Sequence, residues 1–475
     1  MKRISLLAVY SLLPVTLFLS ITVQAQQLAD DWHGTLQAFP IIVHITWNNA
    51  NKNYQATMDS PEQNAYGYAF DSFTVVDNQV KATMAQLHVT MEGTIENTNR
   101  INGQWKQGMV QLPFIMDRGK LEIAKPVRPQ EPFPPFPYHT TDVTFTNTDK
   151  SITYGGTLTT PEAGKNFPVA LLISGSGAQN RNSEIFGHKP FLLIADYLTR
   201  HGIAVLRVDD RGVGQTTGHY QGSTIADFTK DAAAAVAYLK TRKDIINPKK
   251  IGLIGHSEGG AIAPTLVAGD KDIAFMVLLA GPGVNGKNVM LAQNKAIASA
   301  IDSNSVNAYL ELYGKITDLV LATDTTGLYT RTIKMGEQWL KQQTPQTLST
   351  LGITAENISR QTLVLAYAMS NPEIKSVLAY DPLPVLSNVK CPVLALNGSK
   401  DVQIVASLNL PGIKKILTES GNKDVTTIEL PGLNHLFQTA GTGMPSEYKT
   451  ITETFSPKAL EQISSWILQH TNKTR

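Results

Sequence analysis

The sequence IGLIGHSEGG at residues 251–260 is an apolar strand that runs directly into a G-x-S-x-G pattern. In a nucleophile elbow the serine, here Ser257, occupies the apex of a tight strand-to-helix turn in a strained backbone conformation. A side chain two residues before or after it would collide with neighbouring backbone, so Gly255 and Gly259 are both needed. The pattern alone occurs by chance in many chains, but the apolar residues before it and the small residues after it favour an elbow.

The size and composition of the chain predict a globular protein of two domains, or one large domain with insertions. It has 475 residues, of which 42% are hydrophobic, enough for a sizeable core. A formal charge of +2 without a basic run argues against a nucleic-acid partner. The single cysteine, Cys391, precedes an apolar run and is interpreted as a buried hydrophobe.

The first 25 residues are predicted to be a signal peptide. Lys2 and Arg3 supply the positive start, an apolar run extends over residues 4–23, and small residues precede the expected cleavage after Ala25. The alternative is a retained membrane anchor, because the run is near spanning length. We expect an exported protein, periplasmic or secreted, with no stable membrane span after cleavage. Export without disulfides fits a bacterial periplasm.

Two regions of different pattern precede the elbow. Residues 27–120 alternate apolar and polar side chains in short runs broken by Asn, Gly and Asp, which predicts a small all-β domain, a sandwich or a barrel. Residues 121–139 are rich in proline and predict an extended, semi-rigid linker.

Residues 140–475 alternate predicted strands with predicted helices, which indicates a mostly parallel sheet flanked by helices. The expected strands are residues 167–174, 203–208, 251–255, 273–280, 393–397 and 425–430, and the expected helices 190–200, 225–240 and 457–469. Between residues 284 and 381 the alternation stops, and amphipathic helices are expected over 289–301, 306–321, 330–342 and 359–369. We interpret this stretch as an inserted helical lid that shapes a substrate pocket.

A serine nucleophile needs an adjacent base that is itself oriented by a carboxylate. In the α/β-hydrolase arrangement the acid and then the histidine follow the serine in the chain. Beyond Ser257 the histidines are His435, in a loop just after the last predicted strand, and His470, near the C-terminus. The position of His435 favours it as the base.

The acid is expected at Asp401, just past the predicted strand 393–397. Asp381 and Asp424 compete with it, and Glu429 is a weaker candidate. Asp381 precedes a proline at the end of the expected lid, and Asp424 opens a strand at the edge opposite to where sites form in parallel sheets.

An oxyanion hole requires two backbone N–H donors. One is expected from Glu258, directly after the nucleophile, and the other from Ser176, in the loop that ends the strand 167–174. The carboxylate of Glu258 is expected to make a structural hydrogen bond. The residues Asp209 to Gly212 predict a buried ion pair that holds a loop.

Other chemistries find no support in the sequence. The glycine-rich residues 174–177 match neither a P-loop nor G-x-G-x-x-G, and no zinc or calcium motif occurs. No cofactor and no metal is implied.

The chain resembles bacterial exported serine esterases of the α/β-hydrolase superfamily that carry a Gly-His-Ser-Glu-Gly-Gly elbow. The resemblance extends over about residues 140–470 and rests on residues 172–177 with Arg181, 207–214, the elbow, 380–382 and 391–401. It implies the α/β-hydrolase fold, with nucleophile, acid and base at Ser257, Asp401 and His435. The N-terminal region is similar, less specifically, to a small β domain that often precedes such hydrolases.

These observations predict a serine carboxylesterase that acts on a small-molecule ester, with short-chain acyl or acetyl groups, through an acyl-enzyme. A serine peptidase or an acyl-thioesterase on the same fold is the nearest alternative. A different class of function is a cell-envelope or carbohydrate-binding protein in which the β domain carries the activity.

Overall fold

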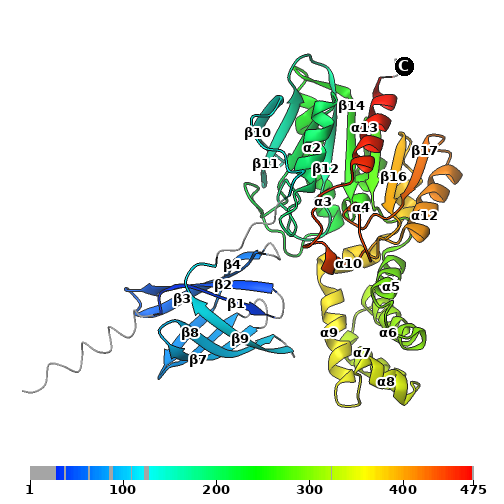
Figure 1. Cartoon of the computed structure of the whole chain (residues 1–475). Helices are drawn as coiled ribbons and strands as arrows, with labels where there is room; N and C mark the ends of the chain where they lie inside the picture. The colour runs from blue at the N-terminus through cyan, green and yellow to red at the C-terminus, as the bar shows by residue number, and fades with distance from the viewer. Residues whose placement is uncertain are drawn as a thin grey trace, which may run out of the picture. The chain divides into compact units, whose positions relative to one another are not determined.

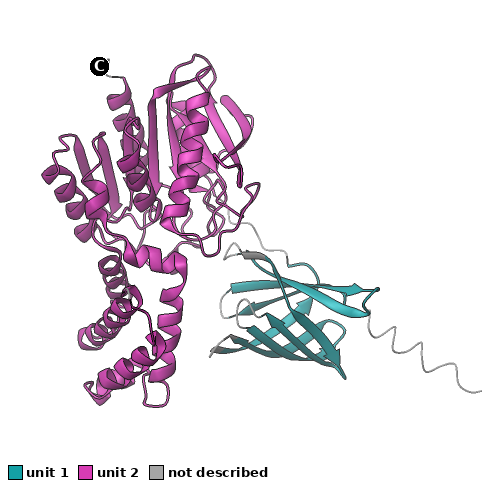
Figure 2. Cartoon of the chain, turned by 180° about the vertical axis from the view of Figure 1, so that it is seen from behind, with its two compact units in different colours: residues 1–125 teal, residues 126–475 magenta. Residues whose placement is uncertain are grey.

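The computed structural model describes residues 28–36, 39–61, 65–84, 89–107, 110–121, 128–322 and 324–472. The chain divides into two compact units, residues 1–125 and 126–475, which Figure 2 colours separately. The expected signal peptide and part of the expected linker lie outside the described residues. Among the described helices, none has both the length and the apolar composition needed to cross a membrane.

The described residues of unit 1 form one antiparallel sheet of nine strands, in the order β4-β3-β2-β1-β9-β8-β7-β6-β5. The strands are β1 (Asp30–Leu36), β2 (Phe39–Asn48), β3 (Asn53–Ser60), β4 (Ala65–Ala69), β5 (Ser72–Val76), β6 (Gln79–Met84), β7 (Val89–Asn97), β8 (Arg100–Gln107) and β9 (Val110–Arg118). The sheet is continuous and curls until β3 contacts β5. The small all-β domain expected here is therefore present, and of its two expected forms, a sandwich or a barrel, the single curled sheet is a half-barrel.

The period-two pattern of unit 1 explains its core. Along β2 the side chains of Ile41, Val43 and Ile45 are buried, while those between them are at least partly exposed. Alternate residues of a strand point to opposite faces, so one face of the sheet collects most of the apolar side chains. There they pack around Trp32 and Trp105 in a single cluster. One buried face is enough to stabilise a curled sheet of this size.

A histidine on β2 links three neighbouring strands of unit 1. His44 Nδ1 lies 2.6 Å from Asp31 Oδ1 on β1, and His44 Nε2 lies 3.0 Å from Asp59 Oδ2 on β3. Burial lowers the pKa of His44, but the hydrogen bonds and charges of Asp59 and Asp31 outweigh burial and raise it above 6.5. The stabilisation by this cluster is therefore complete below pH 6.5 and is lost as pH rises through the higher pKa of the folded state.

We expect the amides of β2 and β3 to lose protection as pH rises from 6 to 9, and His44→Gln to remove most of that dependence. Hydrogen exchange measured on residues 39–60, corrected for the intrinsic exchange rate, checks this. The change should be a few-fold at most, because partly exposed ion pairs contribute under about 1 kcal/mol. His33→Gln on β1 is the control, and an unchanged pH dependence in His44→Gln would contradict the prediction.

The proline-rich segment expected as a free linker over residues 121–139 is in part a packed element. Arg128 is buried in unit 2 and donates from Nη2 to the carbonyl oxygen of Phe186 at 2.7 Å. Gln130 Nε2 donates to the carbonyl oxygen of Phe455 at 2.9 Å. These side chains satisfy carbonyls of loops far along the chain, so the segment after residue 127 is bound to unit 2.

The described residues of unit 2 form an eight-stranded sheet in the order β10-β11-β13-β12-β14-β15-β16-β17. The strands are β10 (Tyr138–Thr146), β11 (Thr153–Pro161), β12 (Phe167–Ile173), β13 (Ala204–Val208), β14 (Ile246–His256), β15 (Phe275–Leu279), β16 (Val393–Gly398) and β17 (Val425–Leu430). From β13 to β17 neighbouring strands are parallel, whereas β11 is antiparallel to both β10 and β13. This order is that of the α/β-hydrolase fold. The hairpin β10–β11, which precedes the first expected strand, was not anticipated.

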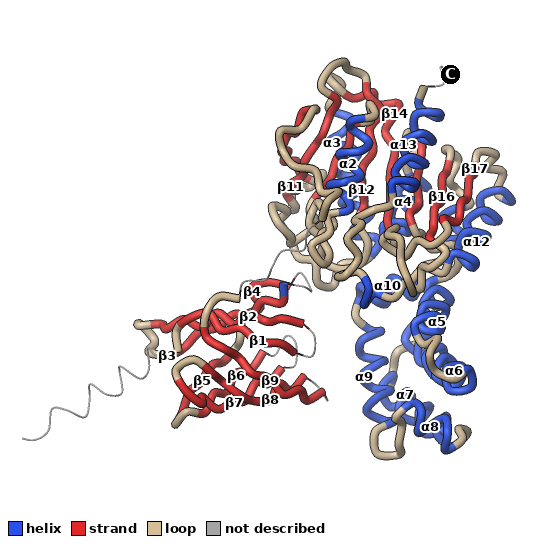
Figure 3. The backbone as a smooth tube through the Cα atoms, viewed as in Figure 1, coloured by secondary structure: helices blue, strands red, loops and turns tan. Residues whose placement is uncertain are grey.

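Helices cover both faces of this sheet (Figure 3). One face carries α2 (Pro190–Arg200) and α13 (Pro457–Thr471), and the other carries α3 (Ile225–Thr241), α4 (Gly259–Gly269), α11 (Pro382–Leu386) and α12 (Ala406–Glu419). The central strands are buried on both sides: every side chain of β15 is enclosed. Their continuous apolar runs follow from this double burial. The two apolar clusters so formed hold the strand ends in place.

A helical segment is inserted between β15 and α11 and extends from the carboxyl ends of the strands (Figure 1). It consists of α5 (Gly286–Ile297), α6 (Ser303–Leu321), α7 (Leu328–Leu340), α8 (Pro345–Leu351), α9 (Ile358–Ser370) and α10 (Pro372–Ala379). Its own apolar cluster surrounds Trp339 and Ile316. Four of these helices were expected; α8 and α10 are too short for a periodic pattern to reveal and begin at prolines.

Candidate active site

The elbow is a strained turn in the structure. Ser257 has φ of 55°, in the left-handed region that side chains with a Cβ rarely adopt. It stands between the end of β14 and the start of α4, and its N–H donates to the carbonyl oxygen of Leu279 at 2.9 Å. Strain of this kind persists only where the surrounding structure enforces it, and it concentrates at functional sites.

Both glycines flanking Ser257 are required by space. A Cβ on Gly255 would lie 2.1 Å from the carbonyl oxygen of Gly259, and a Cβ on Gly259 would lie 2.3 Å from the carbonyl oxygen of Ile173. Both obstacles are backbone atoms, which cannot rotate away. The collision argued from the motif is thus present in the structure.

The expected acid and base are brought together. Asp401 Oδ2 lies 2.8 Å from His435 Nδ1, and each residue is only 4% exposed. Asp401 Oδ1 accepts hydrogen bonds from the N–H groups of Gln403 and Ile404, at 2.8 Å each. With both oxygens occupied the carboxylate cannot rotate, so it holds the proton of His435 on Nδ1 and leaves Nε2 free as a base.

The competing acids lie elsewhere. Asp381 accepts from the N–H of Leu383 at 3.0 Å and caps α11. Asp424 lies 3.2 Å from Nε2 of His470. Glu429 is exposed on β17. Each of these carboxylates is separated from His435, whose Nδ1 is already bound by Asp401.

His256, within the elbow, supports the loop that carries His435. Its Nε2 lies 3.0 Å from the carbonyl oxygen of His435, and the two rings are 4.8 Å apart. Burial, followed by the charge of His435, lowers the pKa of His256 to about 4. It is therefore neutral at physiological pH and donates its Nε2 proton. The motif contains this histidine, but no role was assigned to it from the sequence.

The expected oxyanion donors lie on two sides of the nucleophile. Glu258 is the N-cap of α4, and Ser176 lies in the loop after β12. No hydrogen bond among the described residues uses the N–H of either one. Unpaired N–H groups at the start of a helix attract negative charge, so the N–H of Glu258 suits an oxyanion.

Ser257, His435, Glu258 and Ser176 all line one cavity of about 340 Å³. No hydrogen bond between Ser257 and His435 exists among the described residues, but both side chains line this cavity. Much of the wall is apolar and comes from the helical segment: Val289 and Met290 of α5, and Ile374, Val377 and Leu378 of α10. An apolar cavity with a few convergent polar groups is the usual form of a small-molecule site.

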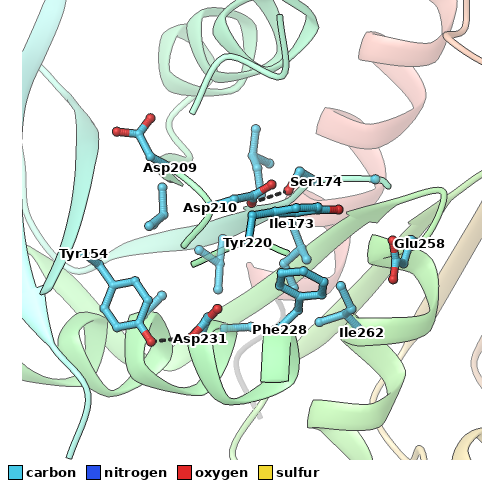
Figure 4. A pocket seen from close by; sticks show the side chains of 16 residues that line it. Tyr154, Ile173, Ser174, Asp209, Asp210, Tyr220, Phe228, Asp231, Glu258 and Ile262 are labelled. Atoms are coloured by element: carbon cyan, nitrogen blue, oxygen red, sulfur yellow. Dashed lines mark hydrogen bonds between the residues drawn. The ribbon is translucent and has the colours of Figure 1, made fainter. Parts of the chain in front are cut away.

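The loop that carries Ser176 is fixed by Asp210, which follows β13. Asp210 accepts from the hydroxyl of Ser174 at 2.7 Å and from the N–H of Gln179 at 2.9 Å. Figure 4 shows Asp210 pointing toward Ser174, with Glu258 on the same small cavity of about 50 Å³. Burial, with the charges of Asp231 and Glu258, raises the pKa of Asp210 to about 7 against the effect of those hydrogen bonds.

The ion pairs at residues 209–212 differ in detail from the expectation. Asp209 binds Arg181 at 2.6 Å, and Arg211 binds Asp231 at 2.7 Å. There are two pairs, and each has its partner outside the motif. Sequence reasoning recognised the loop-holding role, but the partners are tens of residues away and only the fold selects them.

The carboxyl group of Glu258 makes the structural hydrogen bond expected for it, with the Ser176 side chain, through one oxygen only. Glu258 is 7% exposed, and its Oε1 has no hydrogen-bond partner. Burial raises the pKa of Glu258 to about 7; the Ser176 side chain lowers it through a hydrogen bond, and Glu373 raises it further. An unpaired buried oxygen is costly when charged, so the neutral acid is favoured.

Among the described residues, no group of three or more His, Cys, Asp or Glu could hold a metal ion.

Comparison with known proteins finds similarity to a hydrolase family and to an esterase. Residues 189–347 match a family of hydrolases described as "Serine aminopeptidase, S33". The Esterase EstD of Thermotoga maritima is 24% identical over 325 residues, which is 68% of each chain. These matches and the strand order support a hydrolase with the α/β-hydrolase fold.

Solved structures also align with the chain. The alpha/beta hydrolase GrgF from Penicillium sp. sh18 has a TM-score of 0.42 and 17% identity, covering 70% of this chain and 99% of its own. The Pyrococcus furiosus esterase Pf2001 has a TM-score of 0.40 and 15% identity, covering 70% and 92%.

We expect Glu258→Gln to reduce the loss of stability with rising pH. In the wild type the acid has a raised pKa, so its contribution to stability is complete below pH 4.5 and is lost as pH rises through about 7. One pKa unit corresponds to about 1.4 kcal/mol. Between pH 5 and pH 8 the free energy of unfolding should therefore fall by about 2–3 kcal/mol less in the variant than in the wild type. Urea unfolding of unit 2 at both pH values measures this; Glu429→Gln is the exposed control. Equal pH dependence in Glu258→Gln and wild type would refute the raised pKa.

Proposed function

We propose that the chain is a serine carboxylesterase that hydrolyses short-chain acyl or acetyl esters through an acyl-enzyme. Ser257 Oγ attacks the ester carbonyl while His435 Nε2 takes its proton, and the same proton then passes to the leaving alcohol. Water, deprotonated by His435, attacks the acyl-enzyme and releases the carboxylic acid. Asp401 keeps the imidazole oriented, and the N–H groups of Glu258 and Ser176 bind the oxyanion.

The observation that carries the proposal is the hydrogen bond between Asp401 and His435 at the wall of a cavity that Ser257 also lines. A buried carboxylate–imidazole pair favours the charged imidazole that forms when the serine is deprotonated. The strained φ of Ser257 places its side chain at the mouth of the turn, as in a nucleophile elbow. The need for a Cβ-free backbone at Gly255 and Gly259 adds support.

The helical segment is proposed to act as a lid. α5 and α10 supply the apolar wall of the cavity, so they would exclude water from the acyl group. A volume of about 340 Å³ suits an acyl chain of a few carbons and its alcohol better than a long lipid. This role is the one predicted from the sequence for the inserted residues 284–381.

Experiments separate the esterase from three alternatives: a serine peptidase, an acyl-thioesterase and a binding protein. The family match carries the description of a serine aminopeptidase, which favours a peptidase on the same fold. The relative described as an esterase favours ester hydrolysis. An acyl-thioesterase would use the same residues. If instead unit 1 captures carbohydrate or cell-envelope material, binding would survive loss of Ser257.

The proposal extends to localisation. The charged start, the apolar run and the small residues before Ala25 favour export to the periplasm or the medium. Fractionation of the producing cell tests this directly: full-length protein retained in the cytoplasm would contradict it.

We expect the mature protein to hydrolyse short-chain nitrophenyl esters, and Ser257→Ala to reduce kcat by on the order of 10⁵-fold or more, to background. Aminopeptide nitroanilides and acyl-thioesters are assayed in parallel. Faster turnover of the nitroanilides would identify a peptidase, and faster turnover of the thioesters a thioesterase. Ester turnover that persists in Ser257→Ala would sink the mechanism.

The choice of acid has its own test. Asp401→Asn should lower kcat by about 10³- to 10⁴-fold, because the amide no longer holds the proton on His435 Nδ1. Asp424→Asn alters a partly buried pair with His470 that does not line the cavity of Ser257, so it should leave kcat within about twofold. A fluorophosphonate probe should label Ser257 fully in Asp424→Asn and slowly in Asp401→Asn; the reverse order would overturn the assignment.

A further inference from the structure

One hydroxyl group joins the loop that carries Ser176 to the helical segment. The N–H of Gly177 donates to the hydroxyl oxygen of Tyr220 at 2.8 Å. The same hydroxyl donates to Oε1 of Glu373, on α10, at 2.6 Å. Gly177, with φ of 90°, directly follows Ser176, so the hydrogen bond from its N–H fixes the adjoining peptide. Tyr220 thus lies between the loop of residues 174–177, called the oxyanion loop from here on, and the wall of the cavity.

The carboxylate of Glu373 determines how this hydroxyl is used. A tyrosine hydroxyl has one proton to donate and lone pairs to accept with. Because Glu373 accepts the hydrogen bond from that proton, a lone pair of the hydroxyl oxygen remains to accept from the N–H of Gly177. Without an acceptor on α10 the proton could rotate toward Gly177, where two donors would face each other.

The ring of Tyr220 is held independently of its hydroxyl. It packs against Phe228 of α3 with ring centroids 5.3 Å apart. Burial raises the pKa of Tyr220, so the hydroxyl keeps its proton. A second link binds α10 to the same region, since the N–H of Ile225 donates to Ser376 Oγ at 3.3 Å. Removing the hydroxyl alone should therefore leave the ring and the helix in place.

We propose that Tyr220 is a positioning residue that couples the seating of α10 to the geometry of the oxyanion loop. The proposal rests on the oxyanion hole assigned above. α10 also lines the cavity through Ile374, Val377 and Leu378. A substrate that fills the cavity contacts these side chains, holds α10 in place and so keeps Glu373 on Tyr220. The oxyanion donors are then ordered when a substrate is present.

The test uses four variants of the link and one control variant. Tyr220→Phe and Glu373→Ala both break the link and should lower kcat about tenfold with KM nearly unchanged. Glu373→Gln keeps an acceptor oxygen and should restore kcat to within about twofold. The double variant Tyr220→Phe/Glu373→Ala should lose no more than either single variant. Tyr329→Phe, on α7 with the tyrosine 46% exposed, is the matched control and should behave as wild type.

Two readouts separate positioning from a general loss of structure. A trifluoromethyl ketone, which forms an oxyanion on Ser257, should bind the link-breaking variants weaker by the same factor as the fall in kcat. Hydrogen exchange over residues 174–180 should quicken in Tyr220→Phe and Glu373→Ala but not in Glu373→Gln. Additive losses, or a loss in kcat not matched by the ketone affinity, would overturn the proposal.

The exchange measurement also separates this proposal from the esterase assignment. If the wild type hydrolyses no ester, the proposed function fails, yet faster exchange of the loop in both Tyr220→Phe and Glu373→Ala, and not in Glu373→Gln, would still establish the coupling. If esters are hydrolysed and the loop exchanges equally in all variants, the coupling is wrong and the esterase assignment stands.

Discussion

The backbone of Ser257 can reach its left-handed conformation only because no side chain stands at Gly255 or Gly259. Both positions face backbone oxygen atoms closer than any Cβ could approach. The strain is held by the sheet, which is buried on both faces, so β14 cannot shift to relieve it. All other parts of the site are placed relative to this turn: the acid and the base follow the ends of strands further along the same sheet.

Electrostatics and hydrogen bonds refine that placement. Asp401 has both oxygens occupied, and His256 holds the carbonyl of the loop that presents His435. On the other side Asp210 and Tyr220 hold the oxyanion loop. None of these contacts is strong alone, since a typical hydrogen bond contributes about 1 kcal/mol net. Together they restrict the orientation of His435 and of the loop that carries Ser176, which the proposed catalysis by preorganised dipoles requires.

Sequence patterns predicted much of unit 2 because its strands carry continuous apolar runs and its longer helices carry amphipathic ones. α2 begins and ends at the expected residues, and the strand 425–430 coincides with β17. The short helices α8, α10 and α11 were not predicted, because fewer than three helical turns give no periodic pattern of apolar residues. The alternation in unit 1 could not distinguish a sandwich from a barrel, because it reports that one face of a strand is buried and not whether the sheet curls on itself.

The sequence by itself predicted the turn at Ser257 and the positions of the candidate acid and base, Asp401 and His435, after the ends of later strands. These follow from local rules: a turn that admits only glycine, and strands that must be apolar where both faces are covered. The sequence favoured Asp401 over Asp381 and Asp424, but only the tertiary structure shows the hydrogen bond between Asp401 and His435 and places Tyr220 between Gly177 and Glu373. Such partners are separated by 34 to 153 residues, and their meeting depends on how whole helices and strands pack, which no local pattern encodes.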